Sequence, residues 1–414
     1  MAHVKNSSAV LIFLLLIAGL AVDVRPGSGP GADAAKVRTI TLGIPLTNSE
    51  FRQPVTEATS FLELAKKKVT SLGYEVQSLR VTTPPCGNYL KGMAAREIVT
   101  WGQALDEAAT KGNIIVGLGP ANGIPPETLA SLLSGTKKLS ATISVTTADN
   151  RIDEASVEAA ARTILALSKR TKDGIGNFNF AAIASCPPGI PFFPAGYSSA
   201  MTSSFALGME GAVWVQRASA GEKSLASIKA RLRDIIHKDL TPLVETMKSL
   251  EKIGGRTFSG FDVSPAPSGK VSIGRAIESL SGSPVGSPGT LAICAAITDV
   301  LKGLPMKTCG YSGLMLPIME DTILAERAAE GRLTLDQLLL YSAVCGTGLD
   351  VVPLPGDISE EKLESIVRDV ASLSVKWHKP LSARLLPVPG KKAGDLTSFN
   401  DSVLVNTRVL SVPE

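Results

Sequence analysis

The segment VRTITLGI, from Val37 to Ile44, indicates the fold class of the chain. Its β-branched residues predict a strand, and the apolar residues from Phe61 to Val69, at helical spacing, predict a helix behind it. The alternation continues through strand-like runs at 74–81, 113–119, 139–145 and 178–184, with expected helices at 92–111, 126–134 and 153–170 between them. Alternating strands and helices are typical of an α/β fold with a largely parallel sheet.

Composition excludes two classes of protein. The chain has 414 residues, of which 44% are hydrophobic and 19% charged, so it is not a disordered protein and can bury a core. The 42 Lys and Arg residues nearly balance the 38 Asp and Glu residues. A chain without a basic excess lacks the electrostatic signature of nucleic-acid binding, and we expect no nucleic-acid partner.

The amino terminus carries an apolar run from Ala9 to Val22. The run is shorter than the ~20 residues of a membrane-spanning helix and has the length of a signal-peptide core. We therefore expect a secretory signal peptide over 1–21 and a Gly/Pro-rich linker over 22–36. The mature protein would enter the secretory pathway, as a secreted, lumenal or vacuolar protein, without stable membrane insertion. An uncleaved anchor is the alternative.

Histidine and cysteine usage limits the chemistry. The histidines are His3, His237 and His378, too few for a zinc site built from several histidines. The five cysteines are odd in number and contain no C-x-x-C pair, so they do not form a disulfide framework. Pairing of Cys86 with Cys186 stays open. Acid–base chemistry must use carboxylates, Lys, Cys or Tyr.

The pair Glu320-Asp321 ends the apolar run LMLPIMED and begins an expected helix. Acidic residues in a first helical turn complement the helix dipole, which is one interpretation. The other places the pair beside Asp350 and Asp357, where carboxylates could bind Mg²⁺ or Mn²⁺ or act as a general base. Under the second interpretation Asp321 and Asp357 are the metal candidates. The sequence leaves both interpretations open.

Gly/Pro-rich segments follow several expected strands, where α/β proteins place their functional residues. These segments are CPPGIPFFPAGY (186–197), DVSPAP (262–267), SPVGSPGT (283–290), CGTGLDVVPLPGD (345–357) and RLLPVPGKKAGD (384–395). Arg384 and Lys391 in the last segment could bind an anion, or the segment is an ordinary loop. Cys345 is either a buried inert thiol or a nucleophile.

In this order RTITLGI, PPGIPFFPAGY, DVSPAP, GSPGT, the Glu320-Asp321 pair, GLDVVPLPGD and RLLPVPGKKAGD resemble domain-of-unknown-function family 711, the UPF0210 proteins. The resemblance covers about Val37 to Leu410. It implies a fold similar to that of the glycyl-radical enzymes, a single large ten-stranded α/β barrel over residues 37–411, with a site inside the barrel or at its mouth.

The chain lacks the radical loop of the glycyl-radical enzymes, and it departs from the UPF0210 relatives in two ways. A glycyl radical needs a C-terminal R-V-x-G-Y loop, whereas Arg408-Val409 is followed here by Leu410 and Ser411, which excludes a stored radical. Tyr197 is followed by Ser198 at a position where the family often has His. The expected leader also differs from the cytoplasmic prokaryotic relatives.

We therefore expect a non-radical enzyme that acts on a small polar or anionic metabolite by carboxylate-mediated proton transfer, as in an isomerase, lyase or hydrolase. Its catalytic candidates are Glu320, Asp350 and Cys345, with Asp350 or Glu320 as the general base. The substrate-binding candidates are Asp262, Ser264, Tyr197, Arg384 and Lys391. The alternatives are a non-catalytic protein that binds or senses a small-molecule ligand in the same pocket, and a scaffold that forms a homo-oligomer. The cofactor is unknown, and the candidate is a divalent metal ion, Mg²⁺ or Mn²⁺.

Overall fold

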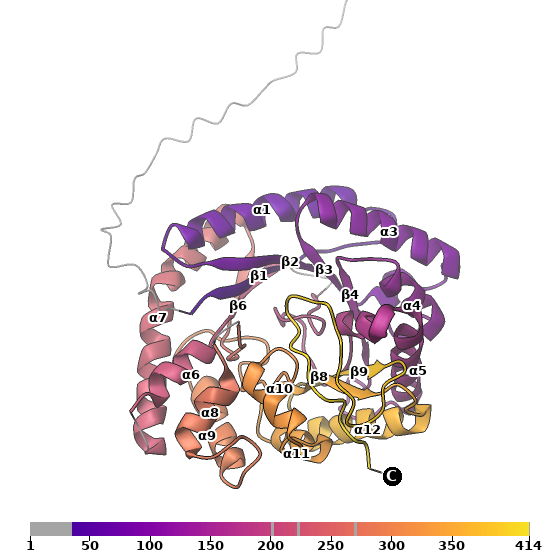
Figure 1. The fold of residues 1–414 in the computed structure, drawn as a ribbon. Coiled ribbons are helices and arrows are strands. Elements are labelled where there is room, and N and C mark those ends of the chain that lie inside the picture. The colour runs from indigo at the N-terminus through magenta and orange to yellow at the C-terminus, as the bar shows by residue number, and fades with distance from the viewer. Residues whose placement is uncertain (1–34, 200–202, 222–223, 269–270, 414) are drawn as a thin grey trace, which may run out of the picture.

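The computed structural model describes residues 35–413, apart from 200–202, 222–223 and 269–270. The expected signal peptide and all but the last residues of the expected linker lie outside the described residues. A nine-stranded sheet runs through the described part, surrounded by helices (Figure 1).

The strands lie in the order β7-β6-β1-β2-β3-β4-β5-β9-β8 across the sheet. Their bounds are β1 Val37–Gly43, β2 Val76–Thr82, β3 Ile115–Pro120, β4 Leu139–Ser144, β5 Phe180–Ala184, β6 Ser204–Met209, β7 Thr257–Asp262, β8 Gly348–Pro355 and β9 Leu381–Val388. The five strands expected in the N-terminal half are confirmed within a few residues at each end.

The helices alternate with the strands through most of the chain. They are α1 Arg52–Thr70, α2 Cys86–Tyr89, α3 Ala95–Lys111, α4 Pro126–Ser134, α5 Glu154–Arg170, the 3₁₀ segment η1 Lys172–Asn179, α6 Ala212–Ser219, α7 Leu225–Gly254, α8 Ile273–Ser281, α9 Thr290–Lys302, α10 Thr322–Ala329, α11 Leu335–Ser342 and α12 Glu360–Trp377. Among the described residues, no helix combines the length and the apolar character that crossing a membrane requires.

Strand pairing confirms a mixed α/β fold with a mostly parallel sheet. Strands β1 to β5 pair in parallel, as do β6 with β7 and β8 with β9. The pairs β1–β6 and β5–β9 are antiparallel, which the repeating pattern did not predict.

The edge strands β7 and β8 do not pair with each other, so hydrogen bonds between strands do not close the sheet into a barrel. The ten-stranded closed barrel expected from the family resemblance is therefore not established. One segment touches both edges: Thr308 forms a bridge with Phe261 of β7, and Pro317 forms one with Asp350 of β8.

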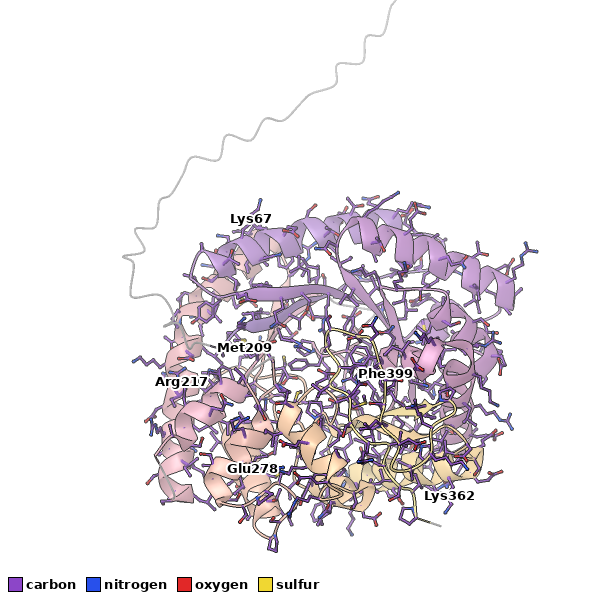
Figure 2. All side chains as sticks on the ribbon, viewed as in Figure 1. Lys67, Met209, Arg217, Glu278, Lys362 and Phe399 are labelled. Atoms are coloured by element: carbon purple, nitrogen blue, oxygen red, sulfur yellow. The ribbon has the colours of Figure 1, made fainter. Side chains whose placement is uncertain are left out.

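The two faces of the sheet differ in chemistry. On the outer face, side chains such as Ile40, Leu42 and Val81 are fully buried in one apolar core with residues of the surrounding helices, such as Leu62 and Leu105. Burial of this apolar surface is the main force that holds helices to the sheet. Figure 2 shows Lys67 on the solvent side of α1, and Met209 and Phe399 inside the molecule.

The inner face, turned away from these helices, receives the segment CPPGIPFFPAGY (186–197). A Cβ on Gly117 of β3 would lie 2.9 Å from the carbonyl oxygen of Gly196, and one on Gly208 of β6 would lie 3.0 Å from the ring of Phe192. Only glycine allows this close approach. The Oγ1 of Thr41 donates to the carbonyl oxygen of Pro191 at 3.0 Å, so the segment also bonds to the sheet.

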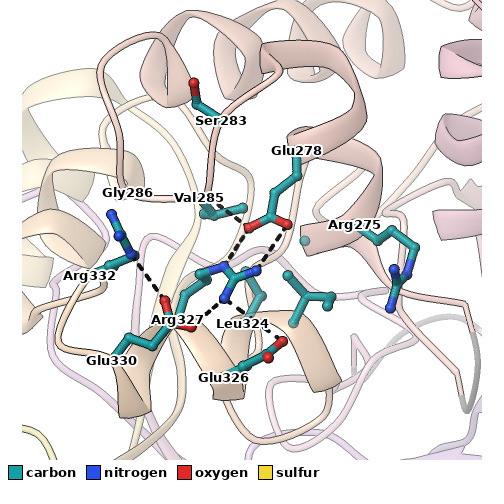
Figure 3. Close-up of polar contacts among 12 residues, drawn as sticks. Arg275, Glu278, Ser283, Val285, Gly286, Leu324, Glu326, Arg327, Glu330 and Arg332 are labelled. Carbon is teal, nitrogen blue, oxygen red and sulfur yellow. Dashed lines mark hydrogen bonds and ion pairs between the residues drawn. The ribbon is translucent and has the colours of Figure 1, made fainter.

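Helices α8 and α10 are joined by charged side chains (Figure 3). The Nε of Arg327 donates to Glu278 Oε1 at 2.6 Å, and its Nη1 donates to Glu330 Oε1, also at 2.6 Å. Because Glu278 belongs to α8 and Arg327 to α10, this contact fixes the two helices relative to each other.

Asp321 joins the same two helices at their N-termini. It is 1% exposed. Its carboxylate oxygens accept hydrogen bonds from the Ser272 hydroxyl and from the backbone N–H groups of Ile273, Gly274, Ile323 and Leu324. The acidic residue therefore acts as the N-cap of α10 and satisfies donors at the start of α8.

Replacement of Asp321 by Ala leaves these buried donors without an acceptor, and we expect it to lower the free energy of unfolding by about 2–4 kcal/mol. Asp321→Asn keeps one acceptor oxygen and is expected to lose less. Urea unfolding of the parent and both variants measures the difference. An alanine variant as stable as the parent would contradict the capping role.

Candidate active site

A cavity of about 330 Å³ lies against the inner face of the sheet. The side chains that line it come from β1 to β4, from β8 and β9, from the 186–197 segment and from the stretch before α10. Its charged lining residues are Arg38, Arg80, Glu320, Asp350 and Arg384. Segments from the whole length of the described chain therefore build one polar site.

Glu320 bridges two of the arginines. Its Oε1 accepts from Arg384 Nη2 at 2.6 Å, and its Oε2 accepts from Arg38 Nη2 at 3.1 Å. Arg38 also pairs through Nη1 with Glu210 Oε1 at 3.1 Å, just after β6. The side chains of Glu320 and Arg384 are 11% and 8% exposed, so solvent screens the pair little. Both oxygens of Glu320 are thus engaged by arginine.

Asp350 has one occupied oxygen. Its Oδ1 accepts from Arg384 Nε at 2.8 Å and lies 2.7 Å from Arg384 Nη2, while Oδ2 has no hydrogen bond to any described residue. Burial raises the pKa of Asp350 above its usual value, the charge of Arg384 opposes the rise, and the like charge of Glu320 adds to it. The free oxygen makes Asp350 the better proton acceptor of the two carboxylates.

Arg80 faces the same cavity without a carboxylate partner among the described residues. Its Nε donates to Ser78 Oγ at 3.2 Å, and its guanidinium lies 5.0 Å from the centre of the Phe193 ring. Burial, with the charge of Arg38 second, lowers the pKa of Arg80 to about 9. The group stays protonated at neutral pH, so the cavity contains a cation that is not neutralised by a direct ion pair.

The lining also includes two buried hydroxyls and several apolar side chains, together with the polar residues Gln77, Ser78, Asn179, Tyr311 and Ser382. Ser140 of β4 and Thr347, just before β8, line the cavity, and their side-chain oxygens have no hydrogen-bond partner among the described residues. Unpartnered buried hydroxyls are uncommon in folded proteins and are often explained by a ligand or water that is not seen. The apolar part of the wall includes Phe192, Phe193 and Met315.

Three of the residues singled out from sequence meet in this cavity. Glu320, Asp350 and Arg384 are joined by the ion pairs described above. They come from the turn before α10, from β8 and from β9. The carboxylate cluster expected around the Glu320-Asp321 pair thus includes Asp350, but it is completed by arginines rather than by further acids.

Asp262 and Ser264 lie beside the cavity and are not part of its lining. Asp262 is fully buried and accepts from the hydroxyl and the N–H of Ser264 and from the N–H groups of Tyr311 and Ser312. Because Tyr311 lines the cavity, Asp262 positions part of the wall and makes no contact with the space itself.

The other three substrate-binding or catalytic candidates are also outside the lining. The hydroxyl of Tyr197 donates to the Cys186 carbonyl at 2.8 Å. Cys345 is buried between α11 and β8, and its thiol does not reach the cavity wall. Lys391 is in the turn after β9. Their proposed roles stay predictions without support from this geometry.

The two metal candidates do not form a carboxylate site. All the bonding of Asp321 is directed to the N-termini of α8 and α10, and Asp357 is exposed in the turn after β8. Within the part of the chain that the structure describes, no group of three or more His, Cys, Asp or Glu residues is arranged to hold a metal ion. The lining residues suit an organic anion better than a cation.

Sequence reasoning missed Arg38, Arg80 and Ser140. Arg38 lies in VRTITLG and Arg80 in VQSLRVT, so each places a full charge inside a strand. Charged side chains are almost never buried without a partner or a function. A charged residue within an otherwise buried strand was therefore the signal that could have identified Arg38 and Arg80. It was not used, because functional residues were expected after the strand ends.

Replacement of Asp350 by Asn isolates the cost of burying this carboxylate. Because burial raises the pKa of Asp350 above its usual 3.8, the native state binds the proton more tightly than the unfolded chain does. The parent therefore loses stability relative to the variant as the pH rises from below 3.8 through the raised value. Urea unfolding of both proteins between about pH 4 and about pH 7 measures this slope. A constant difference between the two proteins would contradict a raised pKa.

Comparison with known proteins finds relatives that match over most of the chain. A UPF0210 protein of Pyrobaculum aerophilum is 31% identical over 87% of this chain and 86% of its own length. Another, from Pyrobaculum arsenaticum, is 31% identical over 80% of this chain and 78% of its own. A UPF0210 protein of Oleidesulfovibrio alaskensis is 27% identical over 91% and 90%.

The expectation of a secreted chain with a signal peptide is corrected by these comparisons. The relatives named above are archaeal and bacterial proteins that carry only the UPF0210 name, and nothing in those names indicates export. Residues 1–21 are outside the described residues, so the expected leader has no structural support. The expectation of a signal peptide rested only on the length and apolar composition of the Ala9 to Val22 run.

The whole-chain similarity agrees with a family model. The model described as "Uncharacterised ACR (DUF711)" matches residues 31–400, which include every strand of the sheet and every charged residue of the cavity lining. The motif resemblance found in the sequence is confirmed, and the chain belongs to the DUF711 family of UPF0210 proteins.

Proposed function

We propose that this protein is a non-radical enzyme that binds a small organic anion in the cavity and moves a proton on it, with Asp350 as the general base. The proposal rests on the presence of two groups in one cavity. Asp350 has a carboxylate oxygen without a hydrogen bond, and Arg80 has no carboxylate partner, among the described residues. Both face one cavity of about 330 Å³, at the lower end of the usual ~300–1,000 Å³ for small-molecule sites.

Asp350 is preferred to Glu320 as the base because of their contacts. Arginine occupies both oxygens of Glu320, so the residue holds Arg38 and Arg384 in place. The Oδ2 of Asp350 has no hydrogen bond to a described residue and can accept a proton, and burial raises the pKa of the Asp350 carboxyl, which makes its carboxylate a stronger base.

The proposed step is abstraction of a proton from carbon next to a carbonyl or carboxylate group. Asp350 Oδ2 takes the proton, and the C–H electron pair stays on the substrate as an enolate. Return of the proton to another carbon gives an isomerase, and expulsion of a leaving group gives a lyase. Arg80 binds the anionic group and so brings the substrate within reach of the base.

We also propose that the fold is a barrel of the glycyl-radical-enzyme type that lacks the radical glycine. Support comes from the segment between α9 and α10, which bridges Phe261 of β7 at Thr308 and Asp350 of β8 at Pro317. The segment spans the opening between the two edge strands and delivers Glu320 to the cavity.

Incubation of the full chain with a metabolite extract, followed by untargeted mass spectrometry, tests the proposed activity. The parent is expected to deplete one small organic anion and to form a product, in an isomerisation or elimination. Asp350→Asn is expected to lower this rate by at least about a hundredfold, as for loss of a general base. Arg332→Gln, on an exposed residue paired with Glu330, is the matched control and should convert at the parent's rate.

Equal conversion by Asp350→Asn and the parent would contradict the role of Asp350. A ligand that raises the thermal stability of the parent without any conversion would identify the alternative, a metabolite-binding or sensing protein that uses the same cavity.

A further inference from the structure

We infer that the ligand of this cavity is a small monocarboxylate with an apolar body, and that its carboxylate binds the free edge of Arg80. The inference rests on the cavity of the proposed function and goes beyond it by naming the class of ligand. It is carried by the contacts that Arg80 makes, by the contacts that the other two arginines already have, and by the chemistry of the remaining wall.

The contacts of Arg80 leave one edge of its guanidinium open. The Nε donates to Ser78 Oγ, and the ring of Phe193 lies 5.0 Å from the guanidinium carbon. The two terminal nitrogens have no hydrogen bond to any described residue. Two parallel N–H groups on a planar edge match the two oxygens of a carboxylate.

The other two arginines of the cavity are already neutralised. Arg384 donates Nε to Asp350 and Nη2 to Glu320. Arg38 uses Nη1 for Glu210 and Nη2 for Glu320. A ligand anion would have to displace one of these buried carboxylates to reach either residue, whereas at Arg80 it displaces none.

Charge limits the ligand to one anionic group. The lining arginines Arg38, Arg80 and Arg384 are matched in number by the carboxyl groups of Glu210, Glu320 and Asp350, so the group of six has no excess of basic residues for a second ligand anion. A second carboxylate on the ligand would find no unpaired cation among the described lining residues and would face Glu320 and Asp350. Like charges at short range in a weakly screened site repel strongly.

Most of the remaining wall surface is apolar, although the polar residues Gln77, Ser78, Asn179, Tyr311 and Ser382 also line the cavity. Phe192, Phe193, Ala195, Ala266 and Met315 line the cavity, and all except Phe193 are buried. An apolar ligand body gains free energy by leaving water for such a wall, whereas a body rich in hydroxyls would leave polar groups unpaired. The hydroxyls of Ser140 and Thr347 can serve one carbonyl or hydroxyl on the ligand.

Isothermal titration calorimetry of the full chain with a matched set of probes tests the inference. The monocarboxylates are butyrate, benzoate and phenylacetate, and the comparison probes are succinate, inorganic phosphate and the neutral isostere benzamide. At least one monocarboxylate is expected to bind, and to bind at least about tenfold more tightly than each of the comparison probes. Tighter binding of succinate or phosphate, or no binding of any monocarboxylate, would overturn the inference.

Variants of Arg80 test whether the carboxylate of the ligand binds this residue. Arg80→Gln is expected to weaken monocarboxylate binding by about 10–100-fold, from the loss of charge-assisted hydrogen bonds. Arg80→Lys keeps the charge but not the planar edge, so its monocarboxylate affinity should lie between those of the parent and Arg80→Gln. Arg332→Gln is the exposed control and should bind as the parent does. If Arg80→Gln does not fold, Arg80→Lys and the probe series with the parent protein test the inference instead. Monocarboxylate affinity equal to the parent's in a folded Arg80 variant would overturn it.

Asp350→Asn separates this inference from the proposed function. The variant should still bind the monocarboxylate, because Arg80 is intact, while conversion is lost. Parent-like conversion by the Asn variant would refute Asp350 as the base and leave the ligand class standing. Conversion that depends on Asp350, together with affinity that does not depend on Arg80, would refute the ligand class alone.

Discussion

The carboxylate of Glu320 is the interaction on which the cavity depends. Its two oxygens bind Arg38 of β1 and Arg384 of β9, which belong to strands from opposite ends of the chain. The residue is held in place by its neighbours: the Asp321 side chain caps α10, and the backbone before it bonds to Asp350 of β8. Removal of one partner from a buried ion pair typically costs about 3–5 kcal/mol, because the other charge is left uncompensated. The same ion pairs therefore hold the strands together and form the charged wall of the cavity.

The polar inner face of the sheet explains how a charged cavity arises in a chain with few histidines. Apolar residues cover the outer face and secure the helices, while Thr41, Arg80, Ser140 and Arg384 occupy the inner face. The segment 186–197 crosses that face because glycines such as Gly117 leave room for it. The space that remains is lined by aromatic rings and charged side chains together, since Arg80 lies over the ring of Phe193 and Arg384 over that of Phe178. Burial, rather than an unusual residue type, gives Asp350 and Arg80 their shifted pKa values.

The sequence predicted the α/β class, the first five strands and three members of the site, since hydrophobic periodicity and the order of the motifs are local properties. It did not predict the antiparallel strands β6 and β9, because pairing direction depends on contacts between residues far apart in the chain. Asp262 and Asp321 illustrate the same limit. Each was a plausible functional acid, and only the structure places backbone N–H groups around both carboxylates, which gives them structural roles. Arg38 and Arg80 were passed over because the functional residues were expected in the segments that follow the strands, and both arginines lie inside strands.

Glu320, together with Glu210 and Asp350, neutralises Arg38 and Arg384, so that among the described lining residues Arg80 is the arginine left for a ligand anion. Calorimetric titration of Glu320→Gln with succinate and with benzoate tests it most directly, since the neutral side chain keeps the size of Glu320 and removes its charge. We expect the variant, confirmed to be folded, to bind succinate at least about tenfold more tightly than the parent does, because three arginines then face only the carboxylates of Glu210 and Asp350 and the group carries a net positive charge. Succinate affinity equal to that of the parent would contradict this role of Glu320.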